Sequence, residues 1–380
     1  MRYYNILISN AAGEVFQPNS QGAFSLVKDG STFTSRVKSP VGNGLINDTG
    51  APNIEFDVPI VGADTPQGKQ WIRIHGVGLK MISQSANLNN QYFKMYGGMA
   101  PGLPLATAQA SQAGLLMSGQ IYQAFGNWQG TDQTLELVVS PGGIVNNGQI
   151  LGLRPPRGIS FSWQVGQTLG NALNAALTQG FPGFKIDTKG ISPNLYSPPG
   201  NAPQYAGYGE LSVFAEYIAN LSLSLGAQIQ PDYPGVTIAV SGGEIKAFDG
   251  TVTAPTINLQ GQDLIGQPTW LTGTTISFKT VLRADIVMGS NVKFPANIIP
   301  PYALLSPNAA APGVPARSKS AFQGTFTVLE IHHFANFRQP DGDSWSSSYV
   351  AVANGEPSGT SFVQTDLPGY ELPGFYDYVN

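Results

Sequence analysis

Cysteine is absent from this chain of 380 residues. That absence excludes disulfide bonds, thiolate metal ligands and a cysteine nucleophile. Charge is also scarce, since Asp, Glu, Lys and Arg together make up 11% of the residues, against roughly 25% in an ordinary globular domain. Interface cores are depleted in charge, so the sequence indicates that partners cover much of the surface.

Basic runs and long hydrophobic runs are missing as well. The formal net charge is −4, which disfavours tight nucleic-acid binding, although a channel that only lets DNA pass needs no basic stripe. No stretch approaches the 18 to 20 apolar residues of a membrane helix, and the apolar run within Met1–Asn10 is too short for a signal peptide. We therefore expect synthesis in the cytoplasm and no stable membrane insertion.

Glycine and proline, with 46 and 29 residues, punctuate many short segments rich in Val, Ile, Phe, Tyr and Thr. This pattern is typical of numerous short strands. The strands predicted in the first part of the chain are Tyr3–Ser9, Ala23–Val27, Asn53–Val61, Gln70–Ser83, Gln91–Gly97, Gly114–Phe125 and Thr131–Ser140.

The middle of the sequence changes to a helical period. Apolar residues from Leu169 to Leu177 recur on one helical face, with Thr168 as the expected N-cap and Gly180 as the residue after the helix. A strand is predicted over Phe184–Thr188, a loop over Ser192–Gly209, and a second helix from Leu211 to about Leu225 with Ser212 as its cap and Gly226 at its end.

The last third returns to short strands, and the stretch Pro300–Ser320 reads as an extended loop with polyproline character. A short echo links Ile72–His75 with Leu329–His332. Four residues do not establish a duplication, and chance similarity between amphipathic strands is the favoured explanation. The strands predicted here are Val236–Val240, Gly243–Phe248, Thr274–Val281, Asp285–Val287, Thr325–Phe334 and Trp345–Val352.

Several segments, taken in order, resemble the baseplate hub proteins of contractile-tailed bacteriophages, including the Mu-like hub family. Each motif is soft alone, and their order, spacing and the total length carry the resemblance over most of the chain. The segments similar to the family's first barrel are Gln91–Met99, Leu103–Ala106, Gly114–Leu116 and Gly119–Gly130. Those similar to its small inserted domain and second barrel are Gly166–Gly183, Asp263–Pro268, Val281–Gly289, Phe326–His333 and Gly342–Trp345.

The resemblance implies a mainly β fold with two tail-tube-like β-barrels per chain and a small inserted α/β domain. The expected division is a first barrel domain over 1–154, the inserted domain over 155–232, and a second barrel domain with a C-terminal tail over 233–380. The resemblance also implies a homotrimer, a pseudo-sixfold ring in the virion tail baseplate that is assembled in the host cytoplasm. This ring would join the tail tube or a tube-end adaptor to the central spike, contact other baseplate proteins and enclose a channel through which DNA passes without specific binding.

Candidate chemistry is sparse, so we expect no enzyme activity, no cofactor and no metal site. The adjacent His332 and His333 would point to opposite faces of a strand and would not chelate one metal together. The candidate partner-interface residues are Trp128, at a turn between two strands, His332 and Trp345. Trp128 at such a tip either anchors a partner or folds back on its own barrel, and His332 is a candidate for pH-dependent assembly.

Three other readings stay open from the sequence. A tail-associated cell-wall hydrolase or esterase would need two converging carboxylates, a histidine-based site or a Gly-x-Ser-x-Gly elbow, and the sequence offers none. A receptor-binding fibre would show long repeats. A tube-end adaptor is harder to separate from a hub because the two share the tube-like barrel.

Overall fold

The structure is a computed structural model of the chain. It describes residues 1–39, 45–65, 70–99, 112–141, 158–197, 203–226, 233–241, 243–252, 256–272, 275–295, 322 and 324–353. The predicted loop Pro300–Ser320 lies outside the described residues.

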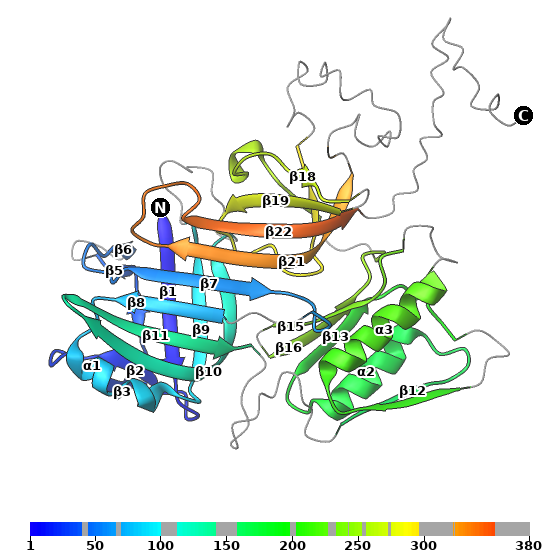
Figure 1. Cartoon of the computed structure of the whole chain (residues 1–380), viewed down its shortest axis with the longest axis horizontal. Helices are drawn as coiled ribbons and strands as arrows, with labels where there is room; N and C mark the ends of the chain where they lie inside the picture. The colour runs from blue at the N-terminus through cyan, green and yellow to red at the C-terminus, as the bar shows by residue number, and fades with distance from the viewer. Residues whose placement is uncertain are drawn as a thin grey trace, which may run out of the picture.

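The chain is mainly β, as expected, with few helices (Figure 1). Fifteen strands of the described residues belong to one large sheet. Nine of them come from the first 140 residues: β1 (Arg2–Ser9), β2 (Val15–Pro18), β3 (Phe24–Val27), β4 (Phe33–Thr34), β7 (Ile54–Ile60), β8 (Gln70–His75), β9 (Tyr92–Met99), β10 (Gly114–Gln129) and β11 (Asp132–Ser140). The other six are β17 (Thr256–Asn258), β18 (Thr269–Trp270), β19 (Thr275–Val281), β20 (Asn291–Lys293), β21 (Thr325–Asn336) and β22 (Trp345–Ala353).

The large sheet is open. Its strands follow the order β18-β19-β22-β21-β7-β8-β11-β10-β9-β1-β2-β3, and β20 and β17 branch from β21. The expected pair of closed barrels is therefore corrected: the described strands do not close on themselves. The physical reason is that β21 of the C-terminal half pairs antiparallel with β7 of the N-terminal half. This pairing uses two strand edges to extend one sheet across the chain.

The two halves of the sheet repeat one strand order. We call β7, β8, β9, β10 and β11 the first repeat, and β18, β19, β20, β21 and β22 the second repeat. Within the first repeat the pairings run β7-β8-β11-β10-β9, and within the second they run β18-β19-β22-β21-β20. Chain order and pairing order therefore match strand by strand. The next strand differs, since β1 pairs antiparallel with β9 whereas β17 pairs parallel with β20.

The sequence echo between Ile72–His75 and Leu329–His332 does not mark this repeat. The first segment lies in β8, whose counterpart is β19, and the second lies in β21, whose counterpart is β10. The repetition is carried by the backbone topology, whereas the four-residue echo joins strands that are not equivalent.

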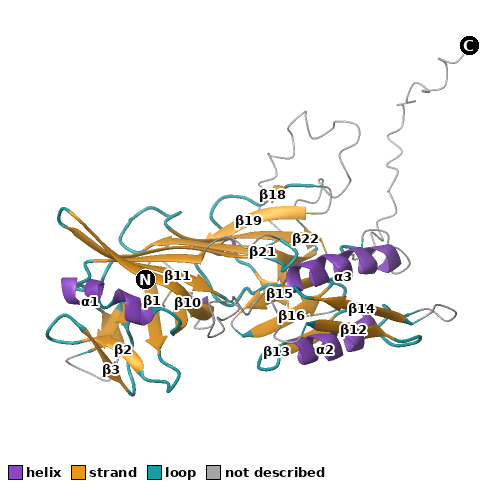
Figure 2. Ribbon diagram, turned by 60° about the horizontal axis from the view of Figure 1, so that its bottom comes forward, coloured by secondary structure: helices purple, strands orange, loops and turns teal. Residues whose placement is uncertain are grey.

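A small α/β unit lies beside the large sheet (Figure 2). Its helices α2 (Leu169–Gly180) and α3 (Leu211–Gly226) pack on two small sheets. One sheet pairs β12 (Ile159–Trp163) with β14 (Gln204–Tyr208), and the other has the order β13 (Lys185–Gly190), β16 (Glu244–Phe248), β15 (Thr237–Ser241). Thr168 is the N-cap of α2 as predicted, and its side chain accepts from the backbone N–H of Asn171.

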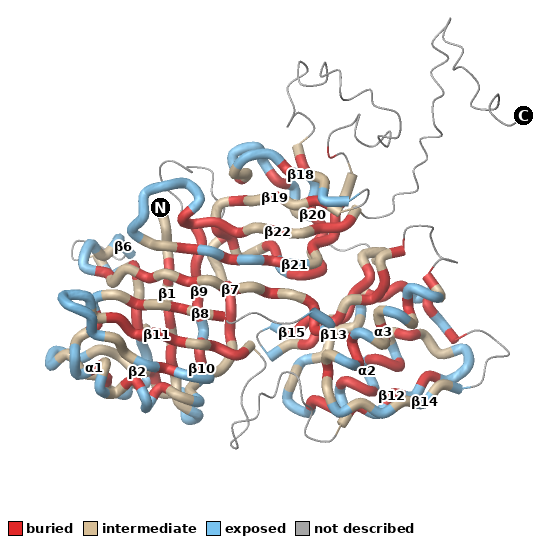
Figure 3. The backbone as a smooth tube through the Cα atoms, viewed as in Figure 1, coloured by how far each residue is buried: buried red, intermediate tan, exposed pale blue. Residues whose placement is uncertain are grey.

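Two hydrophobic clusters make up the core of the described residues, whose buried positions are red in Figure 3. One runs through both repeats of the large sheet, and the other fills the α/β unit. Strands β15 and β16, which the sequence places at the start of the last third, contribute Ile238, Val240 and Ile245 to the second cluster. The α/β unit thus includes chain from both sides of residue 232.

Several local predictions were wrong at their boundaries. The strand expected over Gln70–Ser83 ends at His75, and α1 (Leu79–Ser83) follows it. Asp285–Val287 forms no strand, and Ser192–Gly209 contains β14. Gly180 is the last residue of α2, and Ser212 lies within α3. The remaining described elements are a 3-10 turn at Ser85–Leu88, another at Gly261–Asp263, and the hairpin of β5 (Arg36–Lys38) with β6 (Leu45–Asn47).

Candidate interaction surface

The two repeats match residue by residue at a β-bulge. In β10 the bulge lies between Ile121 and Gln123, and in β21 it lies between Val328 and Glu330. From the residue after each bulge, a row of directly opposed residues crosses four strands. In the first repeat the row is Gln123, Val138, Trp71 and Asp57. In the second repeat it is Glu330, Val350, Ser277 and Thr269.

The residue before each bulge is held in the same way. The backbone N–H of Asn90 donates to the carbonyl of Ile121 at 2.8 Å, and that of Gly289 donates to the carbonyl of Val328 at 2.8 Å. Asn90 and Gly289 both have positive φ, 65° and 74°, a conformation that Gly and Asn adopt most readily. The match therefore extends to an uncommon backbone conformation and independently supports the alignment of the repeats.

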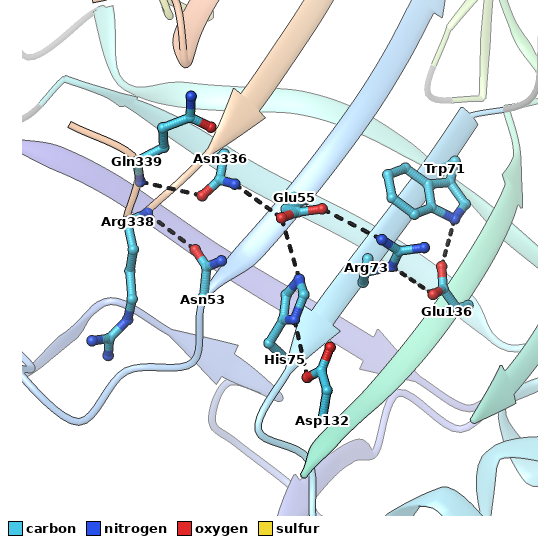
Figure 4. Close-up of polar contacts among 10 residues, drawn as sticks. All are labelled: Asn53, Glu55, Trp71, Arg73, His75, Asp132, Glu136, Asn336, Arg338 and Gln339. Carbon is cyan, nitrogen blue, oxygen red and sulfur yellow. Dashed lines mark hydrogen bonds and ion pairs between the residues drawn. The ribbon is translucent and has the colours of Figure 1, made fainter. Parts of the chain in front are cut away.

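The pairing of β21 with β7, which we call the junction, joins the repeats at their edges. Phe334 lies opposite Asp57, and Ala335 opposite Phe56. Polar side chains cross the junction on the half-exposed face: the Nδ2 of Asn336 donates to Oε1 of Glu55 at 2.9 Å (Figure 4). Backbone pairing and side-chain contacts together fix the register between the repeats.

A mixed-charge network continues from the junction across β8 and β11 (Figure 4). The Nε of Arg73 lies 2.6 Å from Oε1 of Glu136, and its Nη1 lies 3.7 Å from Glu55. The carboxylate of Glu136, which is 2% exposed, also accepts from the indole of Trp71 at 2.6 Å. His75 lies 3.3 Å from Glu55 and 3.4 Å from Asp132. The carboxylates of Glu55, Asp132 and Glu136 thus contact side chains of this chain, namely Arg73, His75 and Trp71.

Trp128 projects from the end of β10, where the sequence placed it. Its side chain is 63% exposed, and its indole N–H donates to the carbonyl of Gly130 at 2.9 Å. Counting from the bulge, its counterpart in the second repeat is Ala335, which is 1% exposed in the core beside the junction. Trp128 is therefore exposed at a position that a neighbouring strand covers in the other repeat.

His332 and His333 point to opposite faces of β21, as predicted. His332 is half-exposed and its Nε2 contacts Oδ1 of Asp57 across the junction. His333 is buried, with Nδ1 2.7 Å from Oγ of Ser347. Burial, reinforced by the charge of His332, lowers the pKa of His333 to about 3. A role for His332 in a partner interface stays a prediction.

Trp345 is buried within the chain, so its assignment to a partner interface is corrected. It is 2% exposed, its indole N–H donates to the carbonyl of Gly98 at 3.0 Å, and its ring meets that of Phe56 at 5.7 Å. Gly98 and Phe56 belong to the N-terminal half of the sheet. Trp345 therefore fastens the C-terminal half to the N-terminal half.

The arrangement offers little for catalysis among the described residues. No group of three or more His, Asp or Glu side chains there is placed to hold a metal ion. A cleft of about 480 Å³ lies between the large sheet and the α/β unit, and Asp187, Glu244 and Lys246 contribute to its lining. Glu244 there pairs with Lys185 at 2.8 Å. In the same part of the chain, no helix is long and apolar enough to cross a membrane.

Sequence reasoning found Trp128 but missed Phe125 and Leu271. Both are large apolar side chains at strand edges, 38% and 56% exposed. The available signal is that residues 121–129 and 264–272 carry no charge at all. Exposed strand edges usually carry charged residues that prevent pairing with other chains.

No protein-family model matches the sequence, and no curated protein matches it in sequence. The chain is similar in structure to the 43 kDa tail protein of prophage MuSo2 from Shewanella oneidensis, with a TM-score of 0.43 and 8% identity over 93% of this chain and 98% of that one. It is also similar to a tail protein from Neisseria meningitidis MC58, with a TM-score of 0.38 and 8% identity over 83% and 94% of the two chains. A chain of the PdpA–VgrG complex gives a TM-score of 0.39 and 8% identity over 92% of this chain and 64% of that one. At these scores and identities the likeness assigns no function.

Proposed function

We propose that this chain is a structural subunit of a bacteriophage tail baseplate, the hub ring that joins the tail tube to the central spike. The observation that carries the proposal is the repeated strand order, with the two repeats joined edge to edge at the junction. A chain with two equivalent units contributes two similar units to any ring that it forms. Three such chains would present six units, which matches a sixfold tube on one side and a threefold spike on the other.

The sequence supports the same proposal. The segments that resemble the hub family cover β9 and parts of β10 and β21. Strands β10 and β21 contain the two bulges, and β9 pairs with β10. A low charge content fits a subunit whose surface is largely covered in the assembled particle. In this role the protein acts by shape and stable contacts, and the reaction chemistry of an enzyme is not required.

The charge of the sheet also fits a passage for DNA. The half-exposed face around the junction carries the carboxylates of Glu55, Asp57 and Asp132 beside the guanidinium of Arg73. Tight DNA binding requires a cluster of cations that neutralises phosphates. A channel lined by such a face would let DNA pass without retaining it.

The molar mass of the purified full chain, measured by light scattering after gel filtration, tests the proposal. For a trimeric hub, we expect a molar mass of about three times the 40.2 kDa of one chain. A stable hexamer would contradict the hub and favour a tube-end adaptor, because six copies would then present twelve units. A chain that stays monomeric at the highest concentration, with no association on mixing with a spike protein, would contradict both.

A further inference from the structure

The junction joins the edge of β21 to the edge of β7. The equivalent edges, that of β10 in the first repeat and that of β18 in the second, are not joined in this way. In the second repeat, β21 pairs with β20 near its start and with β7 from Ile331 to Asn336. In the first repeat, β10 pairs with β9 up to Gln120, and no strand of the described part pairs with 125–129 on that edge. Likewise β7 is covered by β21, whereas no strand of the described residues pairs with the outer edge of its counterpart β18. One chain thus has, on β10 and on β18, the two strand edges that a second junction would need.

We infer that residues 125–129 of one copy pair antiparallel with residues 267–271 of a second copy, repeating the junction between subunits. This inference rests on the proposed ring and names the surfaces that close it. A head-to-tail contact of this kind joins unlike edges, so each copy uses one edge for each neighbour.

The register follows from the matched rows. Phe334 and Asp57 face each other in the junction, and their counterparts are Asn127 and Thr269. The same counting places Phe125 opposite Leu271, as His332 lies opposite Pro59, and Trp128 opposite Pro268, as Ala335 lies opposite Phe56. Pro268 has no backbone N–H, so this residue donates no hydrogen bond in the predicted pairing.

Exposure on the two edges agrees with this register. Phe125, Trp128 and Leu271 are 38%, 63% and 56% exposed in the single chain. Two of them are predicted to face each other, and Trp128 takes the place of a residue that is buried at the junction. The edge of β10 over residues 125–129, which we call the open edge, begins after Ala124, because the N–H of Ala124 already donates to Oδ1 of Asn89 at 2.7 Å. Neither edge carries a charge that would oppose pairing.

Engineered disulfides test the register without background, because the chain has no cysteine. Directly opposed residues in antiparallel strands have Cα atoms about 4.5–5.5 Å apart, within the range that a disulfide spans. The test variant is Asn127→Cys with Thr269→Cys in one chain. The matched positive control is Phe334→Cys with Asp57→Cys, the equivalent pair inside one chain. The out-of-register control is Gln123→Cys with Thr269→Cys.

Under mild oxidation of the full-length protein, the test variant is expected to give a covalent ladder that stops at three chains on a non-reducing denaturing gel. The positive control should stay at one chain with an internal disulfide, and the out-of-register pair should give no ladder above background. A trimer by light scattering whose 127–269 pair fails to crosslink, while the internal control does, would overturn the inference and leave the proposed hub standing. A ladder that continues without limit would support the pairing and overturn the closed ring.

Discussion

Arg283 is a buried charged side chain in the second repeat. It is 3% exposed, and its Nε and Nη2 lie 2.7 and 2.6 Å from the two carboxylate oxygens of Asp285. Its Nη1 lies 3.3 Å from the buried carboxylate of Asp263. Burial lowers the pKa of the guanidinium, but the hydrogen bonds and charge of Asp285, together with Asp263, outweigh this effect and raise the pKa.

Replacing Arg283 with methionine is expected to lower the free energy of unfolding by about 3–5 kcal/mol, because the buried carboxylate of Asp263 and the partly buried carboxylate of Asp285 lose their cation. Urea denaturation measures this loss. The control is Lys185→Gln, which removes the exposed pair with Glu244 and should leave the unfolding midpoint unchanged. Equal midpoints for the Arg283 variant and the wild type would show that the ion cluster does not hold this part of the sheet.

His333 gives the stability of the protein an acid-sensitive component. Its pKa is lowered in the folded chain to about 3, from an ordinary 6.5, so the folded state holds fewer protons than the unfolded state between these values. The stability from this group is complete above pH 6.5 and is lost as the pH falls toward 3, by about 1.4 kcal/mol per pH unit. His333→Asn keeps a polar contact for Ser347 and removes the titration. The free energy of unfolding, measured against pH, should therefore fall less steeply for the variant, and parallel curves would contradict this origin.

At the scale of elements, the sheet depends on close approach between β10 and β11. A Cβ atom added to Gly119 would lie 2.1 Å from the carbonyl oxygen of Ser140, a distance that requires backbone movement. Gly119 lies just before the bulge that aligns the repeats. Its small size therefore helps to set where β10 leaves β9 and where the open edge begins.

Gly119→Ala is expected to destabilise the protein by about 1–3 kcal/mol through overpacking of the sheet. The comparison is Gly207→Ala in β14, where a Cβ would meet no heavy atom within 4 Å, so the change should stay within about 0.5 kcal/mol. Thermal unfolding of the two variants beside the wild type measures both effects. Similar losses for the two would show that the steric contact at Ser140 is not the cause.

The sequence predicted elements well where the periodic pattern is long and failed where tertiary contacts decide. The apolar face from Leu169 to Leu177 predicted α2 together with its cap. The short strand β14 was missed because Gln204–Tyr208 lies in a run of Gly, Pro and Asn, and its pairing with β12 is a long-range contact. The turn to α1 was missed because the apolar residues of Gln70–Ser83 read as one continuous strand.

At the scale of the whole molecule, the class of fold followed from composition, whereas the duplication did not. The equivalent positions Phe125 and His332, or Trp71 and Ser277, share backbone pairing and not residue type. A repeat of this kind leaves almost no trace in the sequence. The same reason explains why Trp345 was assigned to a partner surface, since only the fold shows that the two halves bury it between them.

In the proposed hub, the two equivalent units of each of three chains build a closed ring of six. Electron microscopy of the purified full-length protein tests it most directly, by averaging end-on views of single particles. We predict a ring with threefold symmetry, six similar lobes and a central opening. Particles without an opening, or with twofold symmetry, would contradict it.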